Sequence, residues 1–271
     1  MGDCFQVLPT LEDNSVDLIL TDPPYILDSH GGPTAGEFKR AIHDKHFEFI
    51  SKGFDYETLF PEFKRVLKNM NLILFCSNKQ ISSLMEYWEE KGYGTTLLIW
   101  QKTNPIPFAE GKYLSDVEFI VWVREKGVFF NNDAHHKNKS KVLRFPTMVS
   151  GRVHPTQKPE ALIRKLLLMH SEKGSVVLDP FSGSGTLGVC CIEMEREYIQ
   201  IEMEEEFYRV SLLREEKGKR EKLQDQVFKD MFEVDKPVER KRVYAGTTFA
   251  KKKEKEDKKE KDSFDVLFGG L

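Results

Sequence analysis

Two short segments of the chain carry the side chains that could do chemistry. The first is Thr21-Asp22-Pro23-Pro24-Tyr25, and the second is Asp179-Pro180-Phe181-Ser182-Gly183-Ser184-Gly185-Thr186. Each follows a short apolar run, at residues 16–20 and 176–178, which predicts a buried parallel strand. Ligands of open α/β sheets bind beyond the carboxyl ends of such strands. We therefore expect both segments to face one crevice, each holding a different ligand.

The second segment is a glycine-rich turn between a predicted strand and a predicted helix. Such a turn lets the backbone approach a ligand closely, and the helix start offers free N–H groups. Gly183, Gly185 and Gly188 match the dinucleotide fingerprint, and Glu202 follows Gly183 by 19 residues, so a nicotinamide dehydrogenase is one interpretation. Asp179 would repel a pyrophosphate, however. An acid at this position favours a cofactor with an ammonium group, such as the methionine part of S-adenosylmethionine.

The first segment predicts a rigid turn at a strand end. Proline fixes φ and removes N–H donors, so carbonyl oxygens are left as acceptors. Asp22 and the Pro23 carbonyl could accept the two hydrogens of an NH₂ group on a planar ring stacked against Tyr25. That arrangement frees the nitrogen lone pair and aims it at an electrophile.

Apolar runs alternate with helical patterns along the chain, which favours a mostly parallel sheet covered on both faces. Beyond the two strands above, we expect strands at residues 72–76, 96–100, 117–123 and 198–201. The expected helices are residues 56–67, 81–91, 159–170, 186–195 and 204 to about 221. The runs at 97–100 and 117–123 have no helix between them, so we expect an antiparallel pair at a sheet edge.

Charge is distributed unevenly in a chain whose net charge is only −3. Residues 134–159 hold no acidic side chain, and we interpret them as a surface that contacts phosphates. Its candidate DNA-binding residues are Lys137, Lys139, Lys141, Arg144, Arg152 and His154. From about residue 217 onward, mixed charges predict a flexible tail.

The remaining bulk features suggest a cytoplasmic protein. The four cysteines have no metal-ligand spacing, so we expect reduced, buried thiols and no metal site. No apolar run approaches the roughly 18 to 20 residues of a membrane helix. The start, Met1-Gly2-Asp3-Cys4, does not resemble a signal peptide.

With these motifs in view, residues 2–215 resemble the permuted, β-class amino-methyltransferases of DNA. In that family the Asp-Pro-Pro-Tyr motif precedes the Asp-Pro-Phe-x-Gly-x-Gly motif, as it does here. His154-Pro155-Thr156-Gln157-Lys158-Pro159 resembles a third signature of the family. Three motifs in the family's order make the resemblance specific.

The resemblance implies a role for each matching position. The catalytic clamp on a flipped base would be Asp22, Pro23, Pro24 and Tyr25. S-adenosylmethionine would be held by Asp3, Cys4, Thr156, Lys158, Asp179, Pro180, Phe181, Ser182, Gly183, Gly185, Thr186 and Glu202. Within that set, Glu202 would take the ribose hydroxyls, Asp3 and Cys4 the adenine, and Thr156 and Lys158 the carboxylate end.

The resemblance also implies the architecture. The fold would be α/β, a Rossmann-like S-adenosylmethionine-dependent methyltransferase fold, with a seven-stranded, mostly parallel sheet and an antiparallel edge hairpin. The methyltransferase domain would cover residues 1–216, with an active-site loop at about 27–55 and a target-recognition segment at about 126–153. Residues 217–271 would form the charged tail.

The implied activity is site-specific methylation of the N6 amine of a flipped-out adenine in double-stranded DNA. Alternatives are a cytosine-N4 DNA methyltransferase, a methyltransferase of RNA or protein, and a non-catalytic DNA-binding subunit. Aspartate at the head of the clamp favours adenine, because cytosine-N4 members more often have serine there. A homodimer and a cognate restriction nuclease, as in restriction-modification systems, are the further partners that the resemblance suggests.

Overall fold

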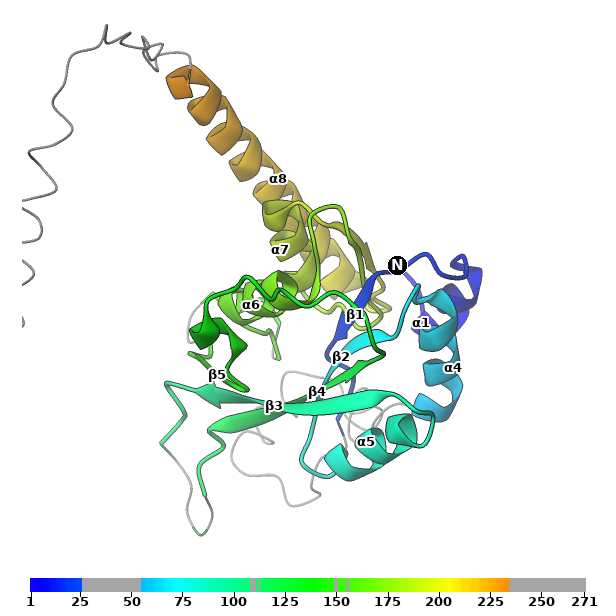
Figure 1. Cartoon of the computed structure of the whole chain (residues 1–271). Coiled ribbons are helices and arrows are strands. Elements are labelled where there is room, and N and C mark those ends of the chain that lie inside the picture. Colours follow the sequence, from blue (N-terminus) through cyan, green and yellow to red (C-terminus); the bar gives the residue numbers. More distant parts are fainter. Residues whose placement is uncertain (26–54, 108–110, 112, 149–150, 155, 234–271) are drawn as a thin grey trace, which may run out of the picture. The chain divides into compact units, whose positions relative to one another are not determined.

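A seven-stranded sheet forms the centre of the protein (Figure 1). The computed structural model describes residues 1–25, 55–107, 111, 113–148, 151–154 and 156–233, with side chains up to Gln226. The strand order is β5-β3-β4-β2-β1-β6-β7. The strands are β1 (Leu18–Thr21), β2 (Asn71–Cys76), β3 (Gly94–Lys102), β4 (Val117–Arg124), β5 (Val142–Phe145), β6 (Val176–Asp179) and β7 (Glu197–Gln200).

The sheet is mostly parallel, as predicted. Strand β1 pairs in parallel with both β2 and β6, and β6 pairs in parallel with β7. Only β4 runs the other way, because it is antiparallel to β2 and to β3. The carboxyl ends of β1 and β6 therefore lie side by side at one edge of the sheet.

The predicted antiparallel pair is confirmed, but it does not form the sheet edge. Strand β5 pairs in parallel with β3 and lies outside it. The sequence pattern of these residues indicates a basic surface segment and no strand. Strand β5 is short and only Leu143 in it is buried, so its apolar signal is weak.

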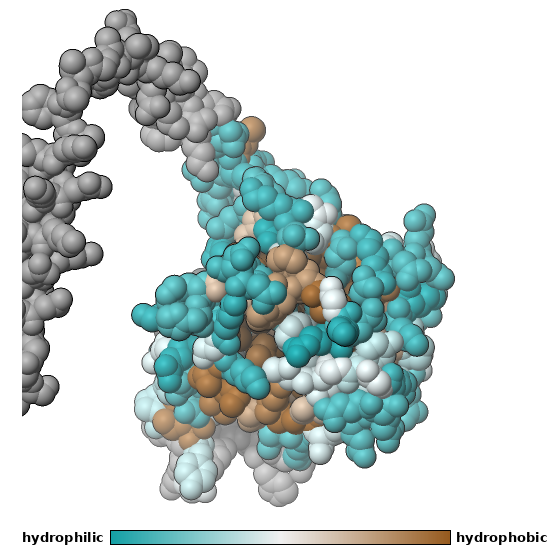
Figure 2. Space-filling model, viewed as in Figure 1, coloured by the Kyte–Doolittle hydropathy of each residue, from teal (hydrophilic) through white to brown (hydrophobic). Residues whose placement is uncertain are grey.

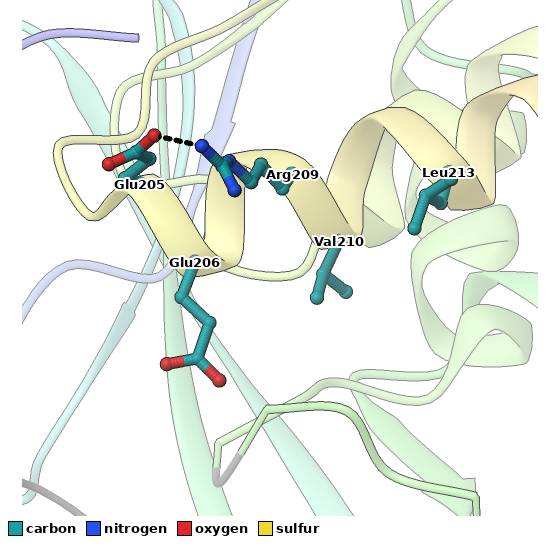
Figure 3. Close-up of a pocket in the computed structure, with 5 residues that line it drawn as sticks. All are labelled: Glu205, Glu206, Arg209, Val210 and Leu213. Carbon is teal, nitrogen blue, oxygen red and sulfur yellow. Dashed lines mark hydrogen bonds and ion pairs between the residues drawn. The ribbon is translucent and has the colours of Figure 1, made fainter.

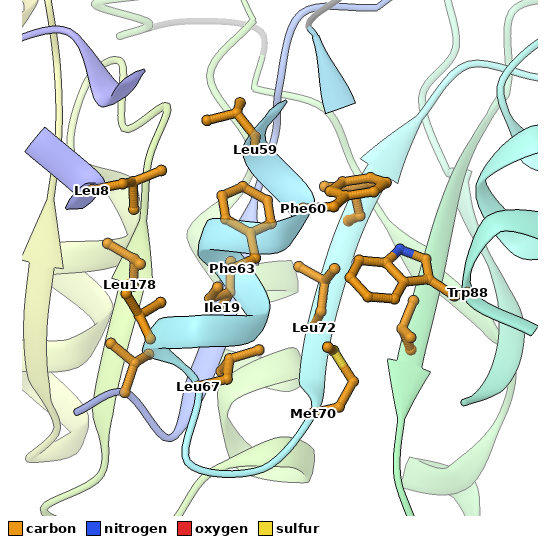
Figure 4. Packing of buried hydrophobic residues seen from close by; sticks show 14 of the residues in the cluster. Leu8, Ile19, Leu59, Phe60, Phe63, Leu67, Met70, Leu72, Trp88 and Leu178 are labelled. Atoms are coloured by element: carbon orange, nitrogen blue, oxygen red, sulfur yellow. The ribbon is translucent and has the colours of Figure 1, made fainter. Parts of the chain in front are cut away.

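Helices α4 (Tyr56–Val66) and α5 (Ile81–Glu89) cover one face of the sheet. Asp55 caps α4 by accepting a hydrogen bond from the Thr58 N–H (3.2 Å). Figure 4 shows Phe60 and Phe63 of α4 beside Trp88 of α5, and the Phe60 and Trp88 ring centroids are 4.8 Å apart. This face also includes α1 (Cys4–Val7) and η1 (Leu8–Thr10).

Helices α6 (Glu160–His170) and α7 (Thr186–Met194) cover the opposite face. The strand residues alternate between the two cores: in β2, Leu72 and Leu74 pack with α4, whereas Ile73 and Phe75 pack with α6 and α7. All four cysteines are free and buried, as predicted. Burial on both faces keeps the strand ends, and hence the motifs that follow them, in fixed positions.

Helix α8 (Glu205–Glu233) is longer than the predicted helix, which ended near residue 221. The hydroxyl of Tyr198 in β7 donates to Glu215 Oε2 (2.8 Å), and Lys222 Nζ donates to the Ile192 carbonyl of α7 (2.8 Å). Met1–Val227 form one compact unit, whose limit falls within α8. The methyltransferase-domain limit near residue 216 stays a prediction. Most of the expected tail lies outside the described residues. The same is true of the expected active-site loop, except for its last residue.

Hydrophilic residues cover most of the face shown in Figure 2, with hydrophobic ones gathered toward its centre and lower left. Within the described ranges, no helix is both long enough and apolar enough to cross a membrane. Those ranges also hold no group of three or more His, Cys, Asp or Glu side chains that could hold a metal ion.

Candidate active site

The two motifs meet at the carboxyl ends of β1 and β6. The hydroxyl of Thr21 donates a hydrogen bond to Asp179 Oδ1 (2.7 Å), and both side chains are buried. These residues are 158 positions apart in the chain. The parallel pairing of β1 with β6 brings them together, so the two motifs lie at adjacent strand ends.

The glycine loop is shaped by backbone that other residues rarely adopt. Gly183 has φ +50° and Gly185 has φ +72°. A Cβ on Gly185 would lie 2.5 Å from Ser211 Cβ of α8, so the loop and α8 approach closely only because the residue is glycine. The loop leads directly into α7, whose first N–H groups lie at the same end of the sheet.

Arg214 of α8 holds this loop, and sequence reasoning missed it. Its guanidinium donates to the Ser184 carbonyl (2.7 Å) and to Thr186 Oγ1 (3.1 Å), and its other nitrogen donates to Glu160 Oε1 (2.9 Å). Nothing in the sequence distinguishes Arg214 from the many solvated charges of this helix. Its role depends on how α8 packs on the loop.

Two predicted cofactor acids flank the loop. Asp179 also accepts a hydrogen bond from the Phe181 N–H (3.1 Å), and burial raises the pKa of its carboxyl to about 7. Glu202 accepts from the N–H of Gly183 (2.8 Å) and from that of Glu204 (2.8 Å). Burial raises the pKa of Glu202 as well. Both acids therefore lie where a cation bound at the loop would stabilise their ionised forms.

The predicted clamp is built around the Asp22 carboxylate. The Tyr25 hydroxyl donates to Asp22 Oδ1 (2.5 Å), and Lys158 Nζ donates to Asp22 Oδ2 (2.5 Å). Pro23 and Pro24 lie between the acid and the ring, directly after β1. Burial raises the pKa of Asp22, and the Lys158 ammonium opposes that rise. Burial also raises the pKa of Tyr25 well above its ordinary value, so the phenol stays protonated and keeps donating.

Two charged residues that sequence reasoning missed extend this contact. Lys158 Nζ lies 3.3 Å from Glu118 Oε2 of β4, and Lys102 Nζ of β3 lies 3.0 Å from Glu118 Oε1. Glu118 is the only carboxylate in β4, whose other residues before Arg124 are apolar. A lone charge inside an apolar run is the signal that could have identified it.

The other predicted cofactor residues lie at the edge of the same region. Asp3 accepts from the Phe5 N–H (3.0 Å) and caps α1. The Gly2 N–H donates to the Glu202 carbonyl (2.9 Å), which brings the start of the chain beside the end of β7. Cys4 is buried, and burial raises the pKa of its thiol to about 12. The Thr156 hydroxyl lies 3.1 Å from His154 Nδ1.

His154 does not lie with the exposed lysines with which the sequence analysis grouped it. Its ring packs against Phe207 at 4.2 Å between centroids, and a Cβ on Gly183 would meet it at 3.4 Å. Burial lowers the pKa of His154 to about 4, so the ring is neutral at neutral pH. A neutral ring packed on the glycine loop is better placed to position that loop than to contact phosphates.

The five other predicted DNA-binding residues are exposed. Lys137 and Lys139 belong to η2 (His136–Lys139), and Lys141 follows it. Arg144 lies on the edge strand β5, where its Nε donates to Gln101 Oε1 (2.9 Å). Arg152 is exposed in the segment that leads to His154.

A surface hollow on α8 contains none of the predicted site residues. It is lined by Glu205, Glu206, Arg209, Val210 and Leu213. Figure 3 shows Glu205 paired with Arg209 along the helix, while Glu206 points away from that pair. With no convergent polar groups, the hollow is not the candidate site.

Strands of this order, with an acid-led glycine loop and an acid-led proline turn at adjacent strand ends, define a nucleic-acid methyltransferase of the permuted kind. The chain belongs to the N6/N4 DNA methylase family, whose model matches residues 16–213. It is therefore a DNA methyltransferase.

Named relatives agree with this assignment. Type II methyltransferase M2.MboI of Moraxella bovis is 29% identical over 229 residues, which cover 78% of this chain and 84% of the relative. Type II methyltransferase M.HinfI of Haemophilus influenzae is 31% identical over 240 residues, which cover 78% of this chain and 66% of the relative.

Solved structures share the fold. The crystal structure of an M1.HpyAVI–SAM complex is 30% identical with a TM-score of 0.59, and the match covers 79% of this chain and 96% of that one. The cytosine-N4-specific PvuII DNA methyltransferase has a TM-score of 0.61 at 17% identity, with 79% of this chain and 84% of that chain covered. At that identity the likeness supports the fold alone.

Proposed function

We propose that this enzyme transfers the methyl group of S-adenosylmethionine to the N6 amine of a flipped-out adenine in double-stranded DNA. The observation that carries the proposal is the Thr21–Asp179 hydrogen bond, which joins an amine clamp to an acid-led glycine loop. Aspartate at the head of the clamp favours adenine over cytosine. The M1.HpyAVI–SAM complex supports the choice of cofactor.

The residues present fit this cofactor. The loop brings its backbone close to a ligand at Gly183 and Gly185 and leads into the start of α7, and Asp179 offers a buried carboxyl to a cationic ligand. Glu202, whose oxygens accept from the Gly183 and Glu204 N–H groups, lies at the strand end where carboxylates bind ribose. We assign cofactor binding to Asp3, Cys4, Thr156, Asp179, Pro180, Phe181, Ser182, Gly183, Gly185, Thr186 and Glu202. The ion pair of Lys158 with Asp22 leads us to group that lysine with the clamp.

The clamp would hold the target amine through its two hydrogens. Asp22 and the Pro23 carbonyl are the acceptors, and the Tyr25 ring is the stacking surface. The adenine must leave the helix to reach them, at a cost of a few kcal/mol of lost stacking.

The bound cofactor supplies an electrophilic methyl carbon on a sulfonium. The amine nitrogen forms the new bond to that carbon, the carbon–sulfur pair stays on sulfur, and one amine proton leaves toward Asp22 or water. Positioning and hydrogen-bond acceptance therefore matter more than a strong base.

Cofactor affinity is expected to depend on pH through Asp179. The pKa of this carboxyl in the free enzyme is about 7, raised by burial. Below that value Asp179 is neutral and cannot attract a cation, so affinity falls by about tenfold per pH unit as the pH decreases. Calorimetric titration with S-adenosylmethionine on either side of pH 7 measures the effect. The Asp179→Asn variant should bind weakly and lose this pH dependence, and an equal slope in both proteins would remove Asp179 from the cofactor site.

The exposed basic residues are proposed to contact DNA phosphates. Changing Lys137, Lys139 and Lys141 together to Ala should weaken DNA binding and reduce the slope of log affinity against log salt by up to about 3. Fluorescence anisotropy at several salt concentrations measures both quantities. The matched control changes Lys64, Lys68 and Lys173, which are exposed at the amino-end side of the sheet. An equal change of slope in both triple variants would argue against the segment.

The test of the proposed reaction identifies its product. Unmodified DNA is incubated with the enzyme and methyl-labelled cofactor, digested to nucleosides and analysed by mass. N6-methyladenine supports the proposal, N4-methylcytosine selects the cytosine alternative, and absence of label selects a non-catalytic subunit.

The proposal extends to location and partners. We place the enzyme in the cytoplasm, as a homodimer with a cognate restriction nuclease. The type II relatives and the reduced, buried cysteines support this placement. Light scattering at working concentration distinguishes the dimer from a monomer.

A further inference from the structure

Four charged side chains of alternating sign run in contact from β3 to the clamp. We call them the charge row: Lys102, Glu118, Lys158 and Asp22. The nitrogen–oxygen distances along the row are 3.0, 3.3 and 2.5 Å. They come from β3, from β4, from the segment before α6 and from the turn after β1, so only the folded sheet assembles them.

The row is poorly exposed. The side chains of Lys158 and Lys102 are 9% and 14% exposed, and those of Asp22 and Glu118 are 20% and 23% exposed. Burial alone would raise the pKa of Glu118, but Lys158 and Lys102 outweigh it and the pKa is lowered. Burial would lower the pKa of Lys158, and Asp22 and Glu118 outweigh it in turn. Their neighbours therefore favour the ionised forms of Glu118 and Lys158, whereas burial raises the pKa of Asp22 against the opposing effect of Lys158. With two basic and two acidic side chains, the fully ionised row has no net charge.

The charges of the row affect the titratable groups beside the glycine loop. Asp22 is one of the groups that raise the pKa of Asp179, and Lys158 is one that lowers the pKa of His154 beside the glycine loop. Among the described residues, Tyr25 and Cys76 also face Asp22, and burial raises the pKa of each, so both are neutral at pH 7. An unbalanced positive charge on Lys158 would repel the sulfonium of the cofactor. Asp22 must also accept the target amine, so Lys158 needs a second counterion.

We propose that Glu118 is a positioning residue, which together with Lys102 holds Lys158 on the Asp22 carboxylate and cancels the lysine's charge toward a cationic methyl donor. The inference rests on the proposed function. Glu118 touches neither ligand; it keeps Lys158 in place to orient Asp22 without making the site positive. S-adenosylmethionine and its product S-adenosylhomocysteine differ by the methyl group and its positive charge. The role of Glu118 can therefore be measured as the ratio of the affinities for the two ligands.

The test is a charge series read by ligand binding. S-adenosylmethionine and S-adenosylhomocysteine are titrated into the wild type, Glu118→Gln, Lys158→Gln and the double variant, whose rows carry net charges of 0, +1, −1 and 0. The preference for the cation should fall roughly tenfold in Glu118→Gln, rise in Lys158→Gln, and return near the wild-type value in the double variant. Glu62→Gln is the matched control, since Glu62 pairs with Arg65 on α4.

The outcomes separate the inference from the proposed function. Equal preferences across the series, or a loss of both ligands in parallel in Glu118→Gln, would overturn the charge-balancing role of Glu118. Failure of the wild type to bind either ligand would instead overturn the proposed function. Glu118→Asp keeps the charge and should keep the preference even where thermal unfolding shows a less stable protein.

Discussion

Asp22→Asn is expected to lower methyl transfer to DNA by roughly a hundredfold to a thousandfold at saturating cofactor, the range seen when one essential polar contact of a transition state is removed. Asn offers one acceptor oxygen in place of two, and its NH₂ group opposes the target amine. Single-turnover transfer of labelled methyl groups measures the loss. Affinity for S-adenosylhomocysteine should remain near the wild-type value, because that ligand carries no sulfonium for the altered charge row to repel.

Tyr25→Phe provides the comparison for this variant. It removes the hydroxyl that donates to Asp22 Oδ1 but keeps a ring on which a base can stack. Its rate should fall by less than about tenfold, since one neutral hydrogen bond contributes about 1 kcal/mol. Wild-type turnover in Asp22→Asn would refute the clamp assignment. A similar loss in Tyr25→Phe would shift the main role from the carboxylate to the phenol.

Gly185→Ala is expected to destabilise the protein by about 2–5 kcal/mol and to weaken cofactor binding. The left-handed backbone at φ +72° contributes about 1–2 kcal/mol of this, and overlap of the new methyl group with Ser211 contributes about 1–3 kcal/mol. The loop must move away from α8 or lose its shape, and either change displaces the N–H groups that precede α7. Denaturant unfolding and titration with S-adenosylhomocysteine measure the two effects.

Gly174→Ala is the matched control for Gly185→Ala. Gly174 has φ +79°, and nothing lies within 4 Å of the position of its missing Cβ, so only the backbone cost of about 1–2 kcal/mol applies. Adding Ser211→Gly to Gly185→Ala should recover part of the loss. Equal destabilisation by both alanine variants would show that the close approach of α8 does not constrain the loop.

The sequence predicted those parts of the site that are encoded locally. The strand before Asp179 and the turn after Gly183 each depend on neighbours in the chain, and parallel strands in α/β sheets place such turns at one edge. The contact of Thr21 with Asp179 follows from that geometry. The family resemblance implied which motif binds the cofactor and which binds the target base. The match to residues 16–213 confirms the family.

The parts that the sequence did not predict depend on long-range packing. Lys158 reaches Asp22 across 136 residues of chain, and Arg214 reaches Ser184 only because α8 folds back over the loop. A charged residue on a polar helix has the same local pattern whether it is solvated or anchored. Strand β5 was not predicted for a related reason, since an exposed edge strand has little apolar periodicity.

Identification of the methylated nucleoside is the decisive test of adenine-N6 methylation by this enzyme. The substrate is DNA from a host without DNA methylation, and Asp22→Asn serves as the negative control. The label should appear in N6-methyladenine with the wild type and be strongly reduced with the variant. Label in N4-methylcytosine, or no label with an enzyme that binds S-adenosylmethionine, would contradict adenine-N6 methylation.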